Sequence, residues 1–105
     1  MAATPEKRVK DKVVSILKQE GVYYFFPATH GYGRSGVPDI VACVNGWFLA
    51  IECKANGNKP TALQVREIER IRRRGGVAVV VDETNWDMLP DLIRKLKADT
   101  IIGEQ

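Results

Sequence analysis

Two acidic residues, Asp39 and Glu52, are predicted to face each other across a short hairpin. Residues 37–44 and 47–54 are β-rich runs, and the Asn45-Gly46 pair between them is typical of a two-residue type I′ turn. Counting outward from that turn places Asp39 directly opposite Glu52, with Cβ atoms about 5 Å apart. The hairpin is therefore expected to hold two carboxylates side by side.

Like charges that face each other destabilise a hairpin, so this pair needs a compensating partner. A hard divalent cation such as Mg²⁺ binds carboxylate oxygens and would remove the repulsion. Side-chain alternation places Lys54 on the same face, where its ammonium can orient a water or neutralise developing negative charge. A metal-activated water with a cation beside it suits phosphodiester hydrolysis. The plainer alternative is a solvated pair of acids with Lys54 as ion-pair partner.

Hydrophobic spacing and turn residues predict the elements that position these side chains. We expect, in order, a helix from Pro5 to Gly21, a strand at 22–26, the hairpin at 37–54, a helix from Thr61 to Gly75, a strand at 77–81 and a helix at 86–98. The run at 77–81 is typical of a strand buried on both faces. Leu63, Ile68 and Ile71 have the spacing of core residues on the second helix. The expected architecture is α/β, a central mixed sheet flanked by helices.

Composition describes one ordinary globular domain spanning residues 1–105. A hydrophobic content of 45% with 28% charged residues excludes a disordered chain, and no apolar run has the length of a membrane span. The net charge of +3 permits an anionic partner such as nucleic acid. Cys43 and Cys53 fall on opposite hairpin faces, which fits free thiols in a reducing cytoplasm, and residues 1–8 lack the apolar stretch of a signal peptide.

The motif residues resemble a known family. Gly36-Val37-Pro38-Asp39, Glu52-Cys53-Lys54 and Gln64 are similar to the virus-type replication-repair nuclease (VRR-NUC) family of the PD-(D/E)xK superfamily, with a match from about Glu6 to Val81. The resemblance implies a restriction-endonuclease-like core and a Mg²⁺- or Mn²⁺-dependent endonuclease that cleaves DNA. Free-standing phage and bacterial members are similar to Holliday-junction resolvases that act as homodimers. Branched DNA and a second copy are therefore the expected partners, in the cytoplasm of a bacterium or phage-infected host.

The resemblance also extends the expected site beyond Asp39, Glu52 and Lys54. It implies that the backbone carbonyl of Cys53 is a further metal ligand and that Glu6, on the first helix, lies near the metal. Glu6 shares a helical face with apolar Val9, which points it inward. An acid in a first helical turn also favours the helix dipole without any other role, and both interpretations stay open.

Gln64 has two explanations. Thr61 and Gln64 have the spacing of a capping box, in which the Gln64 side chain accepts a hydrogen bond from the Thr61 amide. The resemblance instead implies that Gln64 belongs to the catalytic set with Asp39, Glu52 and Lys54. Gln64 lies on one helical face with Ile68, so an inward position is consistent with either role.

DNA contacts are expected from the glycine-containing loop before Asp39 and from the connection after Lys54. His30, Arg34 and Ser35 lie in the loop, and Lys59 lies in the connection. The loop lacks the P-loop pattern, so no nucleotide cofactor is expected. Arginines on the second helix form a basic ridge that Glu67 and Glu69 dilute, which favours a solvated face.

Two alternatives to a free-standing endonuclease remain. One is a non-catalytic DNA-binding module, against which the intact Asp39, Glu52 and Lys54 argue. The other is a nuclease subunit that acts only with a partner, docked on the apolar helix at 86–98. The same helix is equally explained by packing on the sheet.

Overall fold

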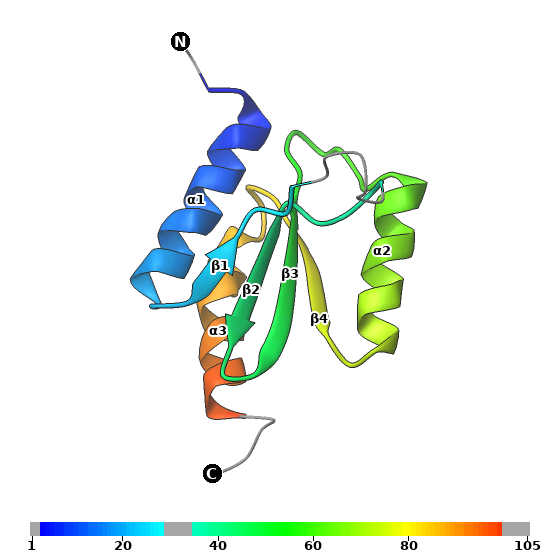
Figure 1. The fold of residues 1–105 in the computed structure, drawn as a ribbon. Coiled ribbons are helices and arrows are strands. Elements are labelled where there is room, and N and C mark those ends of the chain that lie inside the picture. Colours follow the sequence, from blue (N-terminus) through cyan, green and yellow to red (C-terminus); the bar gives the residue numbers. More distant parts are fainter. Residues whose placement is uncertain (1–2, 29–34, 100–105) are drawn as a thin grey trace.

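The elements follow the order expected from the sequence. The structure, a computed structural model, describes residues 3–28 and 35–99 (Figure 1). The elements are α1 (Pro5–Gln19), β1 (Tyr23–Phe25), β2 (Ile40–Val44), β3 (Trp47–Cys53), α2 (Ala62–Arg73), β4 (Val77–Val81), the 3₁₀ turn η1 (Trp86–Met88) and α3 (Leu89–Ala98). The predicted helix at 86–98 thus begins with η1, and Pro90 lies in the first turn of α3, where a missing N–H costs nothing.

The four strands form one mixed sheet in the order β1-β2-β3-β4. The first three strands are antiparallel, and β4 runs parallel to β3. Ile40 pairs with Ile51, which is the register predicted for the hairpin. Asn45 and Gly46 have φ values of 50° and 90°, as a type I′ turn requires. Asp39 directly precedes β2, so it lies one step beyond the Ile40–Ile51 pair, level with Glu52.

The strand at 77–81 packs against apolar residues on both faces, as expected, with Val81 in the core under α1 and α3 and Ala78 in the cluster under α2, but its burial is incomplete. β4 is an edge strand, and Val77, Val79 and Val80 are only half-buried. The guanidinium of Arg72 donates two hydrogen bonds to the carbonyl of Ala78, at 2.7 and 3.2 Å. This contact satisfies a backbone acceptor of the edge strand, a group that would otherwise be open to pairing with another chain.

Helices cover both faces of the sheet, with α1 and α3 on one side and α2 on the other (Figure 1). The main core lies under α1 and α3 and includes Val13, Leu17, Ile40, Leu49, Ile51, Leu89 and Ile93. A smaller cluster of Ala50, Ile68 and Ala78 lies under α2. Leu63 is 44% exposed, contrary to expectation, because the inward side of α2 runs through Gln64 and Ile68, and Leu63 is about 100° away.

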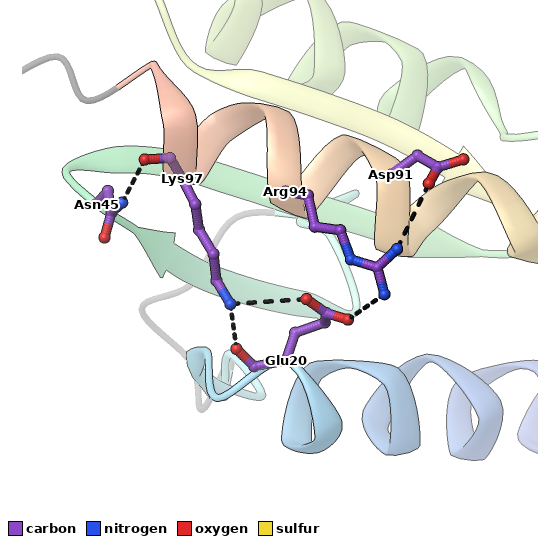
Figure 2. Close-up of polar contacts among 5 residues, drawn as sticks. All are labelled: Glu20, Asn45, Asp91, Arg94 and Lys97. Atoms are coloured by element: carbon purple, nitrogen blue, oxygen red, sulfur yellow. Dashed lines mark hydrogen bonds and ion pairs between the residues drawn. The ribbon is translucent and has the colours of Figure 1, made fainter.

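Ion pairs and hydrogen bonds join the end of α1 to α3. Glu20 lies between Arg94, at 3.0 Å, and Lys97, at 3.6 Å, as Figure 2 shows. The side-chain amide of Asn45 donates a 2.7 Å hydrogen bond from Nδ2 to the backbone carbonyl of Lys97, which connects the hairpin turn to the same helix. Leu89, Ile93 and Leu96 of α3 are buried, so the apolar side of this helix packs within the chain. In the described part of the chain no helix has the length and apolar character needed to cross a membrane.

Gly36 holds the segment that leads into Asp39 against the start of α2. Its φ is +83°, and a Cβ atom there would lie 2.5 Å from the carbonyl oxygen of Leu63 and 2.9 Å from the amide nitrogen of Gln64. A side chain at residue 36 therefore meets both an unfavourable φ and a backbone overlap. The absence of a side chain lets this segment and the first turn of α2 touch.

Replacing Gly36 with alanine is expected to destabilise the protein more than the same change at Gly21. Gly21 has a similar φ of +70°, and a Cβ atom at this residue would have no neighbour within 4 Å, so Gly21→Ala reports the cost of φ alone, about 1–2 kcal/mol. Gly36→Ala adds overpacking of about 1–3 kcal/mol. Urea unfolding followed by circular dichroism measures both, and equal losses would show that the contact with α2 is loose.

Candidate active site

Three carboxylates from separate elements converge at one end of the sheet. Glu6 lies in the first turn of α1, Asp39 before β2 and Glu52 in β3, and each offers an oxygen within 4.8 Å of the others. Glu6 is exposed, Asp39 half-buried and Glu52 buried. Negative charges this close repel one another strongly in a partly buried setting. The arrangement brings together the three side chains that the sequence suggested as metal ligands.

Glu52 is the buried member of the cluster, with only 2% of its surface exposed. Its Oε2 accepts a 2.9 Å hydrogen bond from Nε2 of Gln64 and lies 3.6 Å from the ammonium of Lys54. Its Oε1 is buried and has no hydrogen-bond partner within residues 3–28 and 35–99. Burial, and then the charge of Asp39, raises the pKa of Glu52 to about 7. A buried oxygen without a partner is costly, and a cation bound to it would remove that cost.

At the end of β3, the backbone amide and carbonyl of Cys53 both point toward Asp39. The amide of Cys53 donates a 2.8 Å hydrogen bond to Oδ2 of Asp39, and the amide of Lys54 donates to the carbonyl of Val81 on the other side, at 3.0 Å. In a trans peptide the carbonyl of one residue points opposite to the next amide. The Cys53 carbonyl therefore points away from β4, toward the side of Asp39. Carboxylate and carbonyl oxygens form the donor set that hard cations prefer.

The thiol of Cys53 does not belong to this chemistry. Cys53 is fully buried, and burial followed by the charge of Asp39 raises the pKa of the thiol to about 12. A thiol with that pKa stays protonated at neutral pH and is neither a nucleophile nor a ligand for soft metals. Cys43 is exposed and also free, so the expected absence of a disulfide between them is confirmed.

Lys54 lies beside the carboxylates as the hairpin alternation predicts. Its side chain is largely buried, and its ammonium lies 3.6 Å from Oε2 of Glu52. That separation exceeds the 2.7–2.9 Å typical of a charge-assisted hydrogen bond, so the ammonium keeps donors for another anion or a water. The ion pair of the plainer alternative is present, but Oε1 of Glu52 still has no hydrogen-bond partner in the described part of the chain.

Gln64 makes the capping-box contacts that its spacing from Thr61 predicted, and it also contacts Glu52, one of the residues of the expected catalytic set. Its side-chain oxygen accepts a 2.8 Å hydrogen bond from the amide of Thr61, and Thr61 Oγ1 accepts from the amide of Gln64 at 3.3 Å, which completes a capping box. Its Nε2 donates to Glu52 at the same time. One amide group therefore fixes the first turn of α2 and orients the buried carboxylate.

The residues expected to contact DNA are only partly described. His30 and Arg34 lie outside the described residues, so their role stays a prediction. Ser35 and Lys59 are exposed, in the turn before Gly36 and in the connection between β3 and α2. On α2 the two glutamates that dilute the basic ridge pair with its arginines, Glu67 with Arg70 and Glu69 with Arg73, each at 3.7 Å.

Two residues near the carboxylates were missed by the sequence analysis. Lys10 and Phe26 line a groove that also contains Glu6 and Asp39. Helical spacing was an available signal for Lys10, which is four residues after Glu6 and therefore on the same side of α1. Nothing local to Phe26 indicates that it lies beside α1, because that contact depends on how β1 packs.

Comparison with known proteins agrees with this geometry. The family model "Archaeal holliday junction resolvase (hjc)" matches residues 6–102. A protein of Acyrthosiphon pisum secondary endosymbiont phage 1, named "Putative nuclease p44", is 42% identical over 74 residues, which cover 70% of this chain and 76% of the phage protein.

A solved structure described as "VRR_NUC domain" superposes with a TM-score of 0.66 at 28% identity, covering 90% of this chain and 95% of that one. The mixed sheet with helices on both faces is thus the restriction-endonuclease-like fold that the motif resemblance implied. The match to the resolvase model extends over α1, the hairpin, α2, β4 and α3, so it includes every element that supplies a residue to the carboxylate cluster. This chain belongs to the archaeal Holliday junction resolvase family, a family of nucleases, and has the VRR-NUC fold.

Proposed function

We propose that this chain is a divalent-metal-dependent endonuclease that hydrolyses phosphodiester bonds in branched DNA, with four-way junctions as the preferred substrate. The observation that carries the proposal is the convergence of three carboxylate oxygens within 4.8 Å around a buried Glu52 oxygen that lacks a hydrogen-bond partner among the described residues. Such a group is stable only when protonated or when bound to a cation. Membership of a nuclease family supports the cation-bound state as the functional one.

Each residue of the site has a proposed task. Asp39, Glu52, the Cys53 carbonyl and Glu6 hold Mg²⁺ or Mn²⁺, which when bound supplies an acidic water and positive charge for the phosphoryl oxygens. Lys54 orients the attacking water or neutralises the charge that develops on the phosphate. Gln64 holds the carboxylate of Glu52 in one orientation, which leaves Oε1 for the cation.

The substrate class suggests a homodimer. Resolving a four-way junction takes two cuts on symmetrically placed strands, and the described part of each chain contains one such carboxylate cluster. Tyr23, Phe25 and Phe48 are large exposed side chains on the α2 side of the sheet, and Tyr23 is 69% exposed. Side chains of this kind are enriched at protein interfaces. We propose that this aromatic face contacts the second copy, and the phage relative supports a setting in phage or bacterial replication and repair.

The metal-free protein is expected to lose stability as the pH rises. The pKa of Glu52 is about 7 in the folded chain against an ordinary 4.5, so between these values the folded state holds a proton that the unfolded state releases. The free energy of unfolding therefore falls between about pH 4.5 and about pH 7, by up to about 3 kcal/mol. Urea unfolding in EDTA across this range measures the loss.

Two additions make that measurement specific to the site. Glu52→Gln keeps an oxygen for the Gln64 amide but cannot ionise, so its profile is expected to be flatter and its stability higher than wild type above about pH 7. Mg²⁺ or Mn²⁺ is expected to restore stability to wild type only, because the cation binds the folded state. Identical profiles for the two proteins in EDTA would contradict the proposed electrostatic cost at Glu52.

Two substitutions separate the contribution of the Gln64–Glu52 contact from that of the helix cap. Gln64→Glu keeps an oxygen that accepts from the Thr61 amide but places a carboxylate against Glu52, and we expect activity to fall about 10- to 100-fold. Thr61→Ala weakens the cap by about 1 kcal/mol and leaves the Gln64–Glu52 contact, so kcat is expected to be retained. Cleavage kinetics and thermal unfolding of both variants measure this. Equal loss of kcat in the two variants would mean that Gln64 acts only through the helix cap.

A cleavage assay tests the proposed function as a whole. Labelled four-way junction, flap, single-stranded and linear duplex DNA are incubated with wild type, Asp39→Asn or Lys54→Ala in Mg²⁺, Mn²⁺ or EDTA. We expect metal-dependent, paired symmetric cuts in the junction, with rates lowered at least about a hundredfold by either substitution. Failure of a folded wild-type protein to cut any of these substrates would overturn the proposal and leave a DNA-binding module or a subunit that needs a partner.

A further inference from the structure

A groove of about 510 Å³ runs along α1 and opens beside the carboxylate cluster. Glu6 and Asp39 belong to the cluster, and Lys10 and Phe26 line the continuation of the groove. Lys10 is one helical turn beyond Glu6, about 6 Å farther along the axis. A DNA strand with its scissile phosphate at the carboxylates therefore has a path along this side of α1.

Lys10 forms no ion pair within 4.0 Å among residues 3–28 and 35–99, although it lines the same groove as Glu6 and Asp39. Its ammonium lies 4.6 Å from the centroid of the Phe26 ring. The neighbouring Lys7 differs, because it forms a 2.9 Å ion pair with Asp11. A contact with an aromatic face orients an ammonium but leaves its charge, so Lys10 is directed and still able to bind an anion.

Phe26 supplies an apolar surface at the same place. It is 48% exposed, and it follows the last residue of β1. Its ring packs edge-on against Tyr24, with centroids 6.0 Å apart. The aromatic contact on one side and the Lys10 contact limit the movement of the ring, which leaves the exposed part as a fixed surface against which a sugar or an unstacked base can lie.

We propose that Lys10 and Phe26 form a subsite for the nucleotide next to the scissile phosphate, in which Lys10 binds the neighbouring phosphodiester and Phe26 contacts its sugar and base. The inference rests on the proposed function, because the carboxylates define which phosphate is cut. It adds a selectivity: the phosphate contact is available on any DNA, whereas contact with a base requires a nucleotide that is not stacked in a duplex. Nucleotides at the crossing point of a junction meet that condition more easily than those in a linear duplex.

Lys12 provides a matched control. Its ammonium lies over the ring of Trp86 at 5.8 Å, so it makes the same kind of contact from the same helix, but it does not line the groove. Lys10→Ala and Lys12→Ala remove the same charge and a similar cation–π contact. Any difference in DNA binding between them therefore reports the location of the lysine.

The test measures binding without cleavage. Fluorescence anisotropy of labelled four-way junction and linear duplex DNA is titrated in Mg²⁺ over a range of salt concentrations, with every variant built on Asp39→Asn. We expect Lys10→Ala to weaken binding to both DNAs and to lower the slope of log Kd against log salt by about one, and Lys12→Ala to leave the slope unchanged. Phe26→Leu is expected to weaken junction binding about tenfold, with the slope retained and duplex binding little changed.

The binding results can overturn the proposed subsite independently of whether the protein cuts junctions. Equal slopes for Lys10→Ala and Lys12→Ala would overturn the subsite, even if wild type cuts junctions in the parallel cleavage assay. An equal effect of Phe26→Leu on junction and duplex would overturn the selectivity for an unstacked nucleotide. Thermal unfolding of each variant accompanies the titrations. A purely structural role for Lys10 would change stability without changing the salt slope, and a purely structural role for Phe26 would change stability without a loss of binding specific to the junction.

Discussion

The repulsion among three converging carboxylates is the constraint around which this end of the molecule is organised. Glu52 lies in β3 with almost no exposed surface, and two nearby acids oppose its ionisation. The fold offsets only part of this cost, through Lys54 and Gln64 on one oxygen of Glu52. The other oxygen has no hydrogen-bond partner among the described residues. In the proposed function stability and activity are coupled, because the unpaired carboxylate oxygen that lowers the stability of the metal-free protein is the one that would bind the cation.

The first turn of α2 contacts both of the segments that carry Asp39 and Glu52. Gly36 touches the backbone of Leu63 and Gln64, and the Gln64 side chain joins the helix cap to Glu52. The segment that carries Asp39 and the strand that carries Glu52 are thus both fixed against the same helical turn. The separation of Asp39 and Glu52 is thereby restrained, because Gly36 approaches the backbone of this turn and Glu52 accepts a hydrogen bond from the Gln64 side chain on the same turn. The two carboxylates that we propose as metal ligands would therefore need little reorganisation to bind a cation.

Most of the fold followed from local signals. The Asn45-Gly46 turn fixes the register of the hairpin, and the period of two then assigns Asp39, Glu52 and Lys54 to one face without any knowledge of the rest of the chain. Local patterns were less complete for Leu63, which is exposed, and for β4, which is covered on both faces but only half-buried at several valines. Helical spacing identifies an apolar stripe but not how far it is rotated from the sheet, and an apolar strand does not reveal whether another strand lies beyond it.

The sequence by itself determined the hairpin, the order of the elements and the acids that face each other, because turn geometry and side-chain alternation act over a few residues. Only the tertiary structure decided that Glu6 reaches the carboxylates of the hairpin, that Gln64 caps a helix while it holds Glu52, and that Lys10 lies over Phe26. These three arrangements join residues on separate elements. Their geometry depends on how α1 and α2 pack against the sheet, and that packing is the joint result of the whole buried core.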